Sequence, residues 1–185
     1  MDGPDTDPLQ LGLAAGDERA FAALYDRFAV RMYRTALRML GCREDAEDVV
    51  QDVFMAAVRS RERLGDVRDL TAYLFAALHR AAGRCALRRG RVIQLSPTAS
   101  DEAIAPVEQI MLDNPNWYRL QQAIHTLPDE QREVITLKID GELTFAQIAQ
   151  IMGVSISTVA SRYHYALKKL KTSLVGARTF VEWRR

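Results

Sequence analysis

The sequence predicts an all-α protein in which two small helical domains are joined by a flexible linker. Apolar residues recur at helical spacing on both sides of a central stretch, and strand-like alternation is confined to short apolar runs. The central stretch, residues 92–115, contains three prolines and several polar clusters, which are typical of a linker. We therefore expect a flexible N-terminus (1–15), a first domain (16–91), a second domain (116–172) and a C-terminal tail (173–185).

Charge is segregated along the chain, although the formal net charge is only +1. The range 72–91 holds five arginines and no acid, whereas the range 43–52 holds five acids and one arginine. The range 162–171 is basic again. Solvated helix faces would explain any one of these runs. Together they favour a protein with a nucleic-acid face and a separate protein-binding face.

Three helices are expected in the first domain. The range 20–40 carries apolar residues at helical spacing, namely Phe21, Leu24, Tyr25, Phe28, Met32, Leu37 and Leu40. The next helix begins with acids, which the helix dipole favours, and places Ala46, Val49, Val53 and Ala57 on one stripe. Asp45, Asp48 and Asp52 are expected on another face of that helix. The third helix, 70–89, turns Tyr73, Leu74, Ala77, Leu78 and Ala81 inward and its arginines outward.

The second domain is predicted to end in a helix-turn-helix at residues 143–171. Thr144 and Gln147 form the T-x-x-Q pattern of a capping box, Gly153 permits the reversal, and Ser155 can cap the next helix. On that helix the residues at inward spacing are Ile156, Val159, Tyr163, Ala166 and Leu170. The outer face is small, polar and basic.

Such a second helix fits the major groove of DNA. Its short Ser and Thr side chains can lie near base edges and phosphates, and its Arg and Lys side chains can neutralise phosphates of the DNA backbone. A plain helical hairpin in a bundle is the alternative, but the capping pattern and the basic outer face favour DNA binding. The candidate residues share this outer face or its N-terminal cap. They are Ser155, Ser157, Thr158, Ser161, Arg162, His164, Tyr165 and Lys168.

The motif "DAEDVVQDVFMAAV" (residues 45–58), the arginine-rich third helix and the range 127–171 resemble a known family. They are similar to regions two and four of bacterial RNA polymerase sigma factors of the extracytoplasmic-function (ECF) class, in the sigma-70 family. The resemblance spans about Asp17 to Lys171. It implies a promoter-specificity subunit with no catalytic residue, metal or cofactor of its own, commonly controlled by an anti-sigma factor.

The resemblance also implies a role for each half. The first domain would dock on the clamp helices of the largest subunit of core RNA polymerase through Asp48, Gln51, Asp52 and Met55, with Phe54 in the core. The loop 60–71 and the following helix would read the minus-ten element of promoter DNA as a single strand, with cations along the backbone. The candidate cations are Arg80, Arg84, Arg88 and Arg89.

The second domain would read the minus-thirty-five element, but it departs from the family at two positions. Ala160 stands where a basic residue is common, and Tyr165 stands where arginine is frequent. Base contacts are therefore expected to shift toward Ser157, Ser161, His164 and Tyr165. The apolar residues Phe180, Val181 and Trp183 of the tail are expected to pack on the second domain or to touch a partner.

Other functional classes fit less well. An autonomous helix-turn-helix regulator would leave the arginine-rich helix of the first half unexplained. A nuclease using Asp45, Asp48 and Asp52 as metal ligands would need a convergent histidine or a second acidic cluster. Cys42 and Cys85 have no metal-binding spacing and suit a reducing compartment. Without a signal-peptide pattern or an apolar run of about 18 residues, a cytoplasmic protein without membrane insertion is expected.

Overall fold

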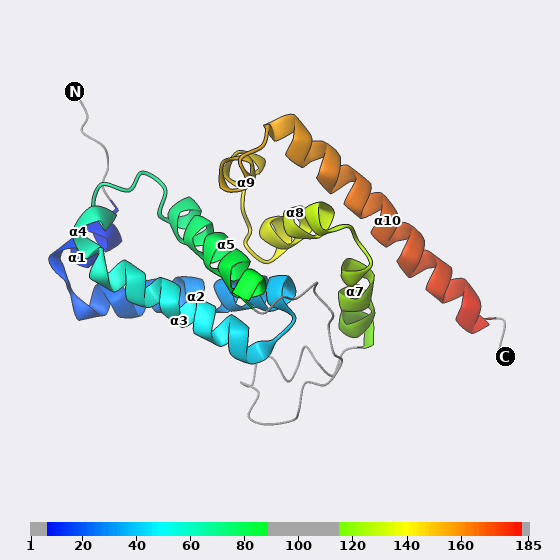
Figure 1. The fold of residues 1–185 in the computed structure, drawn as a ribbon, viewed down its shortest axis with the longest axis horizontal. Coiled ribbons are helices and arrows are strands. Elements are labelled where there is room, and N and C mark those ends of the chain that lie inside the picture. Colours follow the sequence, from blue (N-terminus) through cyan, green and yellow to red (C-terminus); the bar gives the residue numbers. More distant parts are fainter. Residues whose placement is uncertain (1–6, 89–114, 183–185) are drawn as a thin grey trace.

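A computed structural model describes residues 7–88 and 115–182 of the chain (Figure 1). This part of the chain is helical and has no strand, so the all-α prediction is confirmed. The expected linker at 92–115 lies, up to residue 114, outside the described residues. The helices are α1 (Pro8–Ala15), α2 (Glu18–Leu40), α3 (Arg43–Arg59), α4 (Arg61–Leu64), α5 (Leu70–Arg88), α7 (Pro115–His125), α8 (Asp129–Ile139), α9 (Phe145–Met152) and α10 (Ile156–Glu182).

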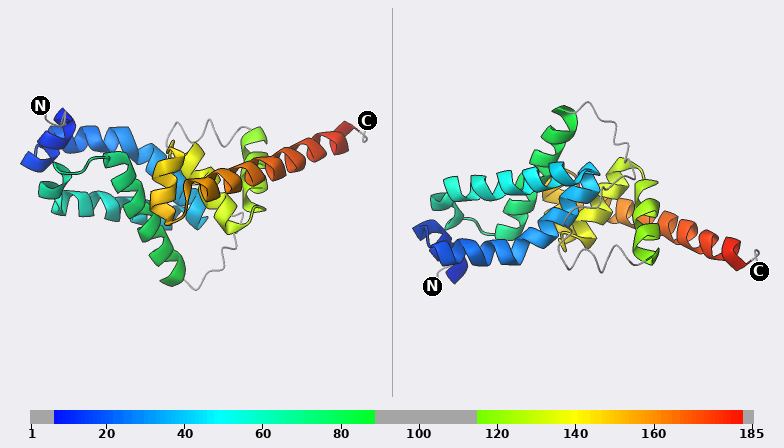
Figure 2. Two further views of the ribbon diagram at one scale, coloured as in Figure 1. Left: turned by 90° about the horizontal axis from the view of Figure 1, so that it is seen from above. Right: turned by 90° about the horizontal axis from the view of Figure 1, so that it is seen from below.

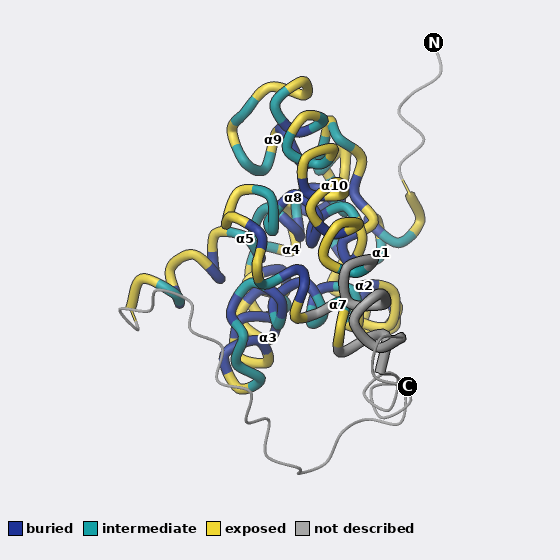
Figure 3. The backbone as a smooth tube through the Cα atoms, turned by 90° about the vertical axis from the view of Figure 1, so that its right-hand side faces the viewer, coloured by how far each residue is buried: buried dark blue, intermediate teal, exposed yellow. Residues whose placement is uncertain are grey.

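The first half is built on α2, α3 and α5, which pack pairwise against one another (Figure 1). Each helix buries the apolar stripe that its spacing predicts, and Figure 3 shows buried and exposed segments alternating along the helices. Leu24, Phe28 and Met32 of α2 meet Val49 and Val53 of α3 in a single cluster. Tyr25 is the exception in α2, because its side chain is 56% exposed.

A short helix stands where a flexible N-terminus was expected. Asp7 caps α1 by accepting a hydrogen bond from Leu9 N at 3.0 Å, and α1 packs against α2 and α4. Leu13 is fully buried. The buried side-chain amide of Gln10 donates to the carbonyl oxygens of Leu64 (3.3 Å) and Val67 (2.5 Å). The expectation is therefore corrected for residues 8–15, which belong to the packed first half.

The second half folds around α7, α8 and α10. Its own cluster of buried side chains consists of Ala123, Ile124, Leu127, Ile135, Ala166 and Leu170. The helix α10 is longer than expected, because its backbone continues through the predicted tail to Glu182. Both views in Figure 2 show its C-terminal end extending beyond the other helices. The side chains of Phe180 and Val181, and all of Trp183, lie outside what the structure describes.

The two halves lie against each other, with α8 next to α2 and α9 next to α5 (Figure 1). Val134, Leu137, Leu143 and Ile148 of the second half belong to the same buried cluster as the core of the first half. The spacing of apolar residues predicts which face of each helix is buried, but it did not predict this contact between the halves.

Two further predictions about individual side chains were wrong. Asp45 is buried at the start of α3, whereas Asp48 and Asp52 are exposed, so the three carboxylates do not share a surface. Ile156 was expected to face inward and is 54% exposed at the start of α10. In the described ranges, no helix has the length and apolar character to cross a membrane.

Candidate nucleic-acid and polymerase interfaces

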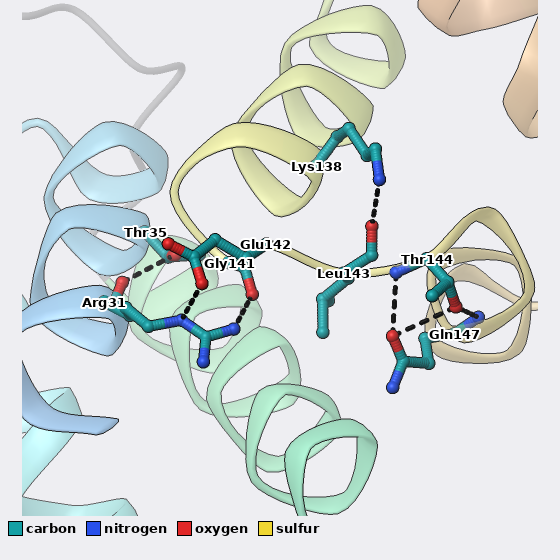
Figure 4. Close-up of polar contacts among 8 residues, drawn as sticks. All are labelled: Arg31, Thr35, Lys138, Gly141, Glu142, Leu143, Thr144 and Gln147. Carbon is teal, nitrogen blue, oxygen red and sulfur yellow. Dashed lines mark hydrogen bonds and ion pairs between the residues drawn. The ribbon is translucent and has the colours of Figure 1, made fainter. Parts of the chain in front are cut away.

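The turn between α9 and α10 has the local structure that its sequence predicts. Thr144 Oγ1 accepts a hydrogen bond from Gln147 N at 3.2 Å, and Gln147 Oε1 accepts one from Thr144 N at 2.7 Å (Figure 4). This reciprocal capping box satisfies two amide groups that the first turn of α9 leaves without a helical partner. Gly153 then ends α9 with φ of 66°, a left-handed conformation that glycine adopts without strain.

Ser155 fixes the start of the presented helix. Its Oγ accepts a hydrogen bond from Thr158 N at 3.1 Å and lies 2.8 Å from the hydroxyl oxygens of Ser157 and Thr158. Because these contacts occupy the Ser155 hydroxyl, we assign Ser155 the role of a cap that positions α10. Ser157 and Ser161 are exposed beside it. Their hydroxyl groups also have local partners, because Ser157 Oγ lies 2.8 Å from Ser155 Oγ and Ser161 Oγ donates to the carbonyl oxygen of Thr158 at 3.0 Å.

The outer face of α10 brings most of the predicted reading residues together. Ser157, Ser161, His164, Tyr165 and Lys168 are all exposed. The rings of His164 and Tyr165 meet edge to face, with centroids 6.1 Å apart. Tyr165 of this pair is the residue that the resemblance places where arginine is frequent.

Among the described cations of this face, Arg162 alone is paired with an acid. Its Nη2 lies 2.7 Å from Glu130 Oε2 of α8, and its side chain is only 21% exposed. A phosphate must therefore replace or share the contact with Glu130 if Arg162 is to bind DNA. The exposed Lys168 has no such restraint among the contacts of the described residues.

The arginines of α5 form a second cationic face. Arg80, Arg84 and Arg88 are exposed and follow one another at i, i+4 and i+8, so they line one side of the helix. Arg89 lies outside the described residues. This row of cations has the spacing to follow a nucleic-acid backbone.

The loop that precedes α5 is held at both ends. Gln10 holds the carbonyl oxygens of Leu64 and Val67 on one side. On the other side Asp69 Oδ1 accepts a hydrogen bond from Ala72 N at 2.9 Å and so caps α5. Neither Gln10 nor Asp69 was among the predicted site residues. Asp69 could have been recognised from the sequence, because an aspartate directly before a helix commonly caps it. No sequence pattern indicates the role of Gln10.

The outer face of α3 gathers the residues predicted to bind polymerase. Asp48, Gln51 and Asp52 are exposed, and Met55 is 48% exposed one turn further on. The surface is therefore acidic at one end and apolar at the other.

The apolar end of this face is larger than predicted. Phe54, expected in the core, is half-buried, and its ring lies 5.1 Å from that of the exposed Tyr25 of α2. Val58 is also exposed and lies three residues after Met55, nearly one helical turn further along α3. The spacing of Val58 from Met55 could have identified it. Tyr25 could not be identified in this way, because the contact joins two helices.

Family comparisons match both halves of the chain. The family described as "Sigma-70 region 2" matches residues 24–92, and the family described as "Sigma-70, region 4" matches residues 118–170. The first range includes α3 and α5, which carry the acidic and the arginine-rich faces. The second range includes α8, α9 and the predicted reading positions of α10.

Similar proteins share nearly the whole length of the chain. The ECF RNA polymerase sigma factor SigL of Mycobacterium tuberculosis is 33% identical over 168 residues, covering 88% of this chain and 93% of the relative. The ECF RNA polymerase sigma factor SigW of Bacillus subtilis is 28% identical over 170 residues, covering 86% of this chain and 91% of the relative.

Two solved structures have a similar fold. CnrH in complex with the cytosolic domain of CnrY has a TM-score of 0.65 and 26% identity, covering 91% of this chain and 96% of that one. The sigma factor RpoE in complex with the anti-sigma factor NepR, from Bartonella quintana, has a TM-score of 0.63 and 25% identity, covering 83% and 96%.

Proposed function

The chain belongs to the ECF class of RNA polymerase sigma factors. We propose that one of its three exposed faces binds polymerase and that the other two bind the two promoter elements. As a sigma factor it binds core RNA polymerase and directs transcription to promoters. The observation that carries the division is the distribution of its charges: an acidic and apolar face on α3, and cationic faces on α5 and α10. The α3 and α5 faces meet at Arg88, which lines one pocket with Asp48 and Asp52.

The α3 face is the proposed polymerase site. Asp48 and Asp52 offer carboxylates to a basic partner, while Met55 and the Tyr25–Phe54 pair offer apolar area beside them. At an interface, buried apolar area supplies affinity and charged groups orient the partner. The proposed partner is the pair of clamp helices in the largest polymerase subunit.

The cationic faces are the proposed DNA sites. Arg80, Arg84 and Arg88 would neutralise the backbone of the melted minus-ten strand, while the loop before α5 reads its bases. The outer face of α10 would enter the major groove at the minus-thirty-five element. Since Ala160 and Tyr165 stand where the family commonly has cationic residues, we expect a minus-thirty-five sequence that differs from the usual one of the family.

We also propose control by an anti-sigma factor. Support comes from the two similar structures, which are complexes with the cytosolic domain of CnrY and with the anti-sigma factor NepR. The proposed role requires no catalytic residue in this chain, because nucleotide chemistry belongs to the polymerase.

Two substitutions test the division of labour between the faces. Asp48→Arg reverses a charge on the α3 face and should abolish co-purification with core polymerase. Arg84→Ala removes one backbone cation and should weaken promoter opening while core binding is retained. Equal loss of both activities in Arg84→Ala, or intact polymerase association in Asp48→Arg, would contradict the assignment. Glu47→Arg, an exposed charge reversal next to Asp48 but outside the proposed set, is the control; because it also breaks the ion pair between Glu47 and Arg43, its helical content is compared with that of the wild type first.

A further inference from the structure

The loop before α5 presents two charged side chains on a backbone that is anchored at both ends. Leu64 and Leu70, on either side of the loop, are buried, and Val67 between them packs against the core of the first half. Asp66 and Arg68, the two neighbours of Val67, are exposed. A nucleic-acid base that approaches the loop can therefore meet a carboxylate and a guanidinium within three consecutive residues.

One buried side chain of α1 holds the backbone of this loop. Gln10 is only 8% exposed, and its side-chain amide donates hydrogen bonds to the carbonyl oxygens of Leu64 (3.3 Å) and Val67 (2.5 Å). The amide nitrogen carries two hydrogens, so it can serve both acceptors. The N–H of Val67 also donates to the carbonyl oxygen of Leu64 at 3.3 Å. Gln10 thus holds both ends of one tight turn.

The hydrogen bond to Val67 also determines where the next N–H points. A peptide unit is planar and trans, so its C=O and N–H point in opposite directions. Because the carbonyl of Val67 is turned toward Gln10, the N–H of Arg68 points away from α1. This N–H has no acceptor among the hydrogen bonds of the described residues. The loop therefore offers a free backbone donor beside its two charged side chains, and base edges are recognised by such donors and acceptors.

Close contacts keep α1 in place against α4 and the loop (Figure 1). Gln10, Leu13 and Ala14 lie at i, i+3 and i+4, so they share one face of α1. Leu13 is fully buried on this face. A Cβ atom at Gly65 would lie 3.2 Å from Cβ of Ala14, which shows how closely the loop approaches α1. The position of the Gln10 amide is therefore set by packing as well as by its own hydrogen bonds.

Building on the proposed sigma function, we propose that Gln10 is a positioning residue for base recognition at the minus-ten element. Gln10 does not touch DNA. It holds the carbonyl oxygens of the loop toward α1, and the N–H of Arg68 and the side chains of Asp66 and Arg68 then meet an unstacked base in one orientation. Base preference at the minus-ten element thus depends on a residue of α1, outside the loop that reads the base.

Orientation matters more for base preference than for affinity. A hydrogen bond weakens steeply when its angle falls below about 120°, so a loop with one fixed orientation favours one pattern of donors and acceptors. Without the Gln10 amide, the loop can turn its groups toward several bases. Contacts with phosphates position a nucleic acid and carry no sequence information. Arg80 and Arg84 should therefore still bind the backbone, because Asp69 caps the start of α5 without help from Gln10.

Selection from a pool of promoters with a randomised minus-ten element tests this role, using the full chain and core polymerase. Gln10→Leu removes the amide donor and keeps a similar volume. We expect base preference at one minus-ten position to fall severalfold, while polymerase binding and preference at the minus-thirty-five element stay as in the wild type. An unchanged minus-ten preference in a folded Gln10→Leu would overturn the proposal.

The affected promoter position shows whether Gln10 acts through the loop. At least one of Asp66→Ala and Arg68→Ala should reduce preference at the same position as Gln10→Leu. Combined with Gln10→Leu, that substitution should cost less than the sum of the two separate losses, because both act on one contact. A loss at a different position, or full additivity, would show that Gln10 does not act through the loop.

A matched control separates orientation of the loop from stability of the first half. Thr35 is fully buried in α2, and its Oγ1 donates to the carbonyl oxygen of Arg31 at 2.8 Å. Thr35→Val removes this buried hydrogen bond at a site away from the loop and should keep the wild-type base preference. An equal loss of preference in Thr35→Val would overturn the proposal. Gln10→Met, which is unbranched like glutamine, is the second variant in case Gln10→Leu impairs folding, and the same loss of preference is expected.

The role of Gln10 and the sigma function fail in different ways. A wild-type chain that transcribes, with full minus-ten preference in Gln10→Leu and Gln10→Met, contradicts the role of Gln10 and leaves the sigma function intact. Loss of polymerase binding in both variants would show a structural role and would also overturn the proposal. A wild-type chain that gives no transcript with polymerase overturns both.

Discussion

The two halves of the chain distribute their buried residues differently. The first half buries α2, α3 and α5 around one cluster that is largely its own. The second half divides its buried residues between two clusters. Ile124, Leu127, Ile135 and Leu170 form a cluster within the half, whereas Val134 and Leu137 join the cluster of the first half.

Helix α8 shows how this division arises. Val134 and Ile135 are consecutive, so their side chains point about 100° apart around the helix and reach different clusters. Separation of the halves would expose Val134 and its neighbours but leave the cluster around Ile135 closed. The first half thus buries most of its apolar side chains by itself. The helix-turn-helix end of the second half needs another surface to keep its apolar side chains from water. In the free chain that surface belongs to the first half.

Phe75→Ala should have the largest effect, because this fully buried ring serves both halves. Removing a buried phenylalanine side chain costs about 3–5 kcal/mol. Urea denaturation measures the loss, and hydrogen exchange should show faster exchange in both α2 and α8. Ile124→Ala is the control, since its effect should stay within α7, α8 and α10. Exchange confined to the first half in Phe75→Ala would contradict the shared cluster.

Gln10→Leu tests the self-sufficiency of the first half. The substitution keeps a similar volume but leaves the carbonyl oxygens of Leu64 and Val67 without their side-chain donor, at a cost of about 1–3 kcal/mol. The loss should appear in the unfolding free energy and as faster exchange around α4, with the second half unchanged. Gln150→Leu, at an exposed position of α9, should change stability by less than about 0.5 kcal/mol. Equal effects of the two substitutions would mean that Gln10 does not hold the loop.

Thr144→Ala tests whether the capping box of α9, in the second half, is coupled to the loop before α5 in the first half. It removes the hydroxyl that caps α9 and should cost about 1 kcal/mol. Because Gln147 of the same capping box donates to Asp69, the amide of Ala72 should also exchange faster. Thr144→Ser retains the hydroxyl and should behave like the wild type. A loss of stability without any change at Ala72 would show that the capping box and the loop are not coupled.

The smallest expected effect concerns pH. Burial, together with Arg132 and with Arg38 from the other half, lowers the pKa of His125 below its ordinary 6.5. The unfolded chain then binds the proton more readily, so the contribution of neutral His125 is complete above about pH 6.5 and is lost as the pH falls further. Unfolding free energies measured between pH 7.5 and pH 5.5 should decline less in His125→Gln than in the wild type. Identical declines would exclude His125 as a source of the pH dependence.

Local chemistry explains which features the sequence predicts. The stripes of α2, α3 and α5, the capping box at Thr144 and the reversal at Gly153 depend on residues a few positions apart, and all were predicted. The ion pair between Arg38 and Asp140 was not, because helical spacing shows which face is apolar but not which distant helix covers it. Gln10 escaped notice for the same reason, since its partners lie far away in the sequence. The expected boundary at residue 16 leaves out α1, because a helix of eight residues has few positions at which a periodic apolar pattern can be recognised.

Run-off transcription tests the central claim most directly. The full chain is combined with core RNA polymerase from its own organism and a pool of promoter fragments with randomised minus-ten and minus-thirty-five elements. We predict discrete transcripts that require the chain, enrichment at both elements, and loss of both with Asp48→Arg. Tight binding of the chain alone to an isolated duplex, with no transcript when polymerase is added, would contradict this account and favour an autonomous regulator.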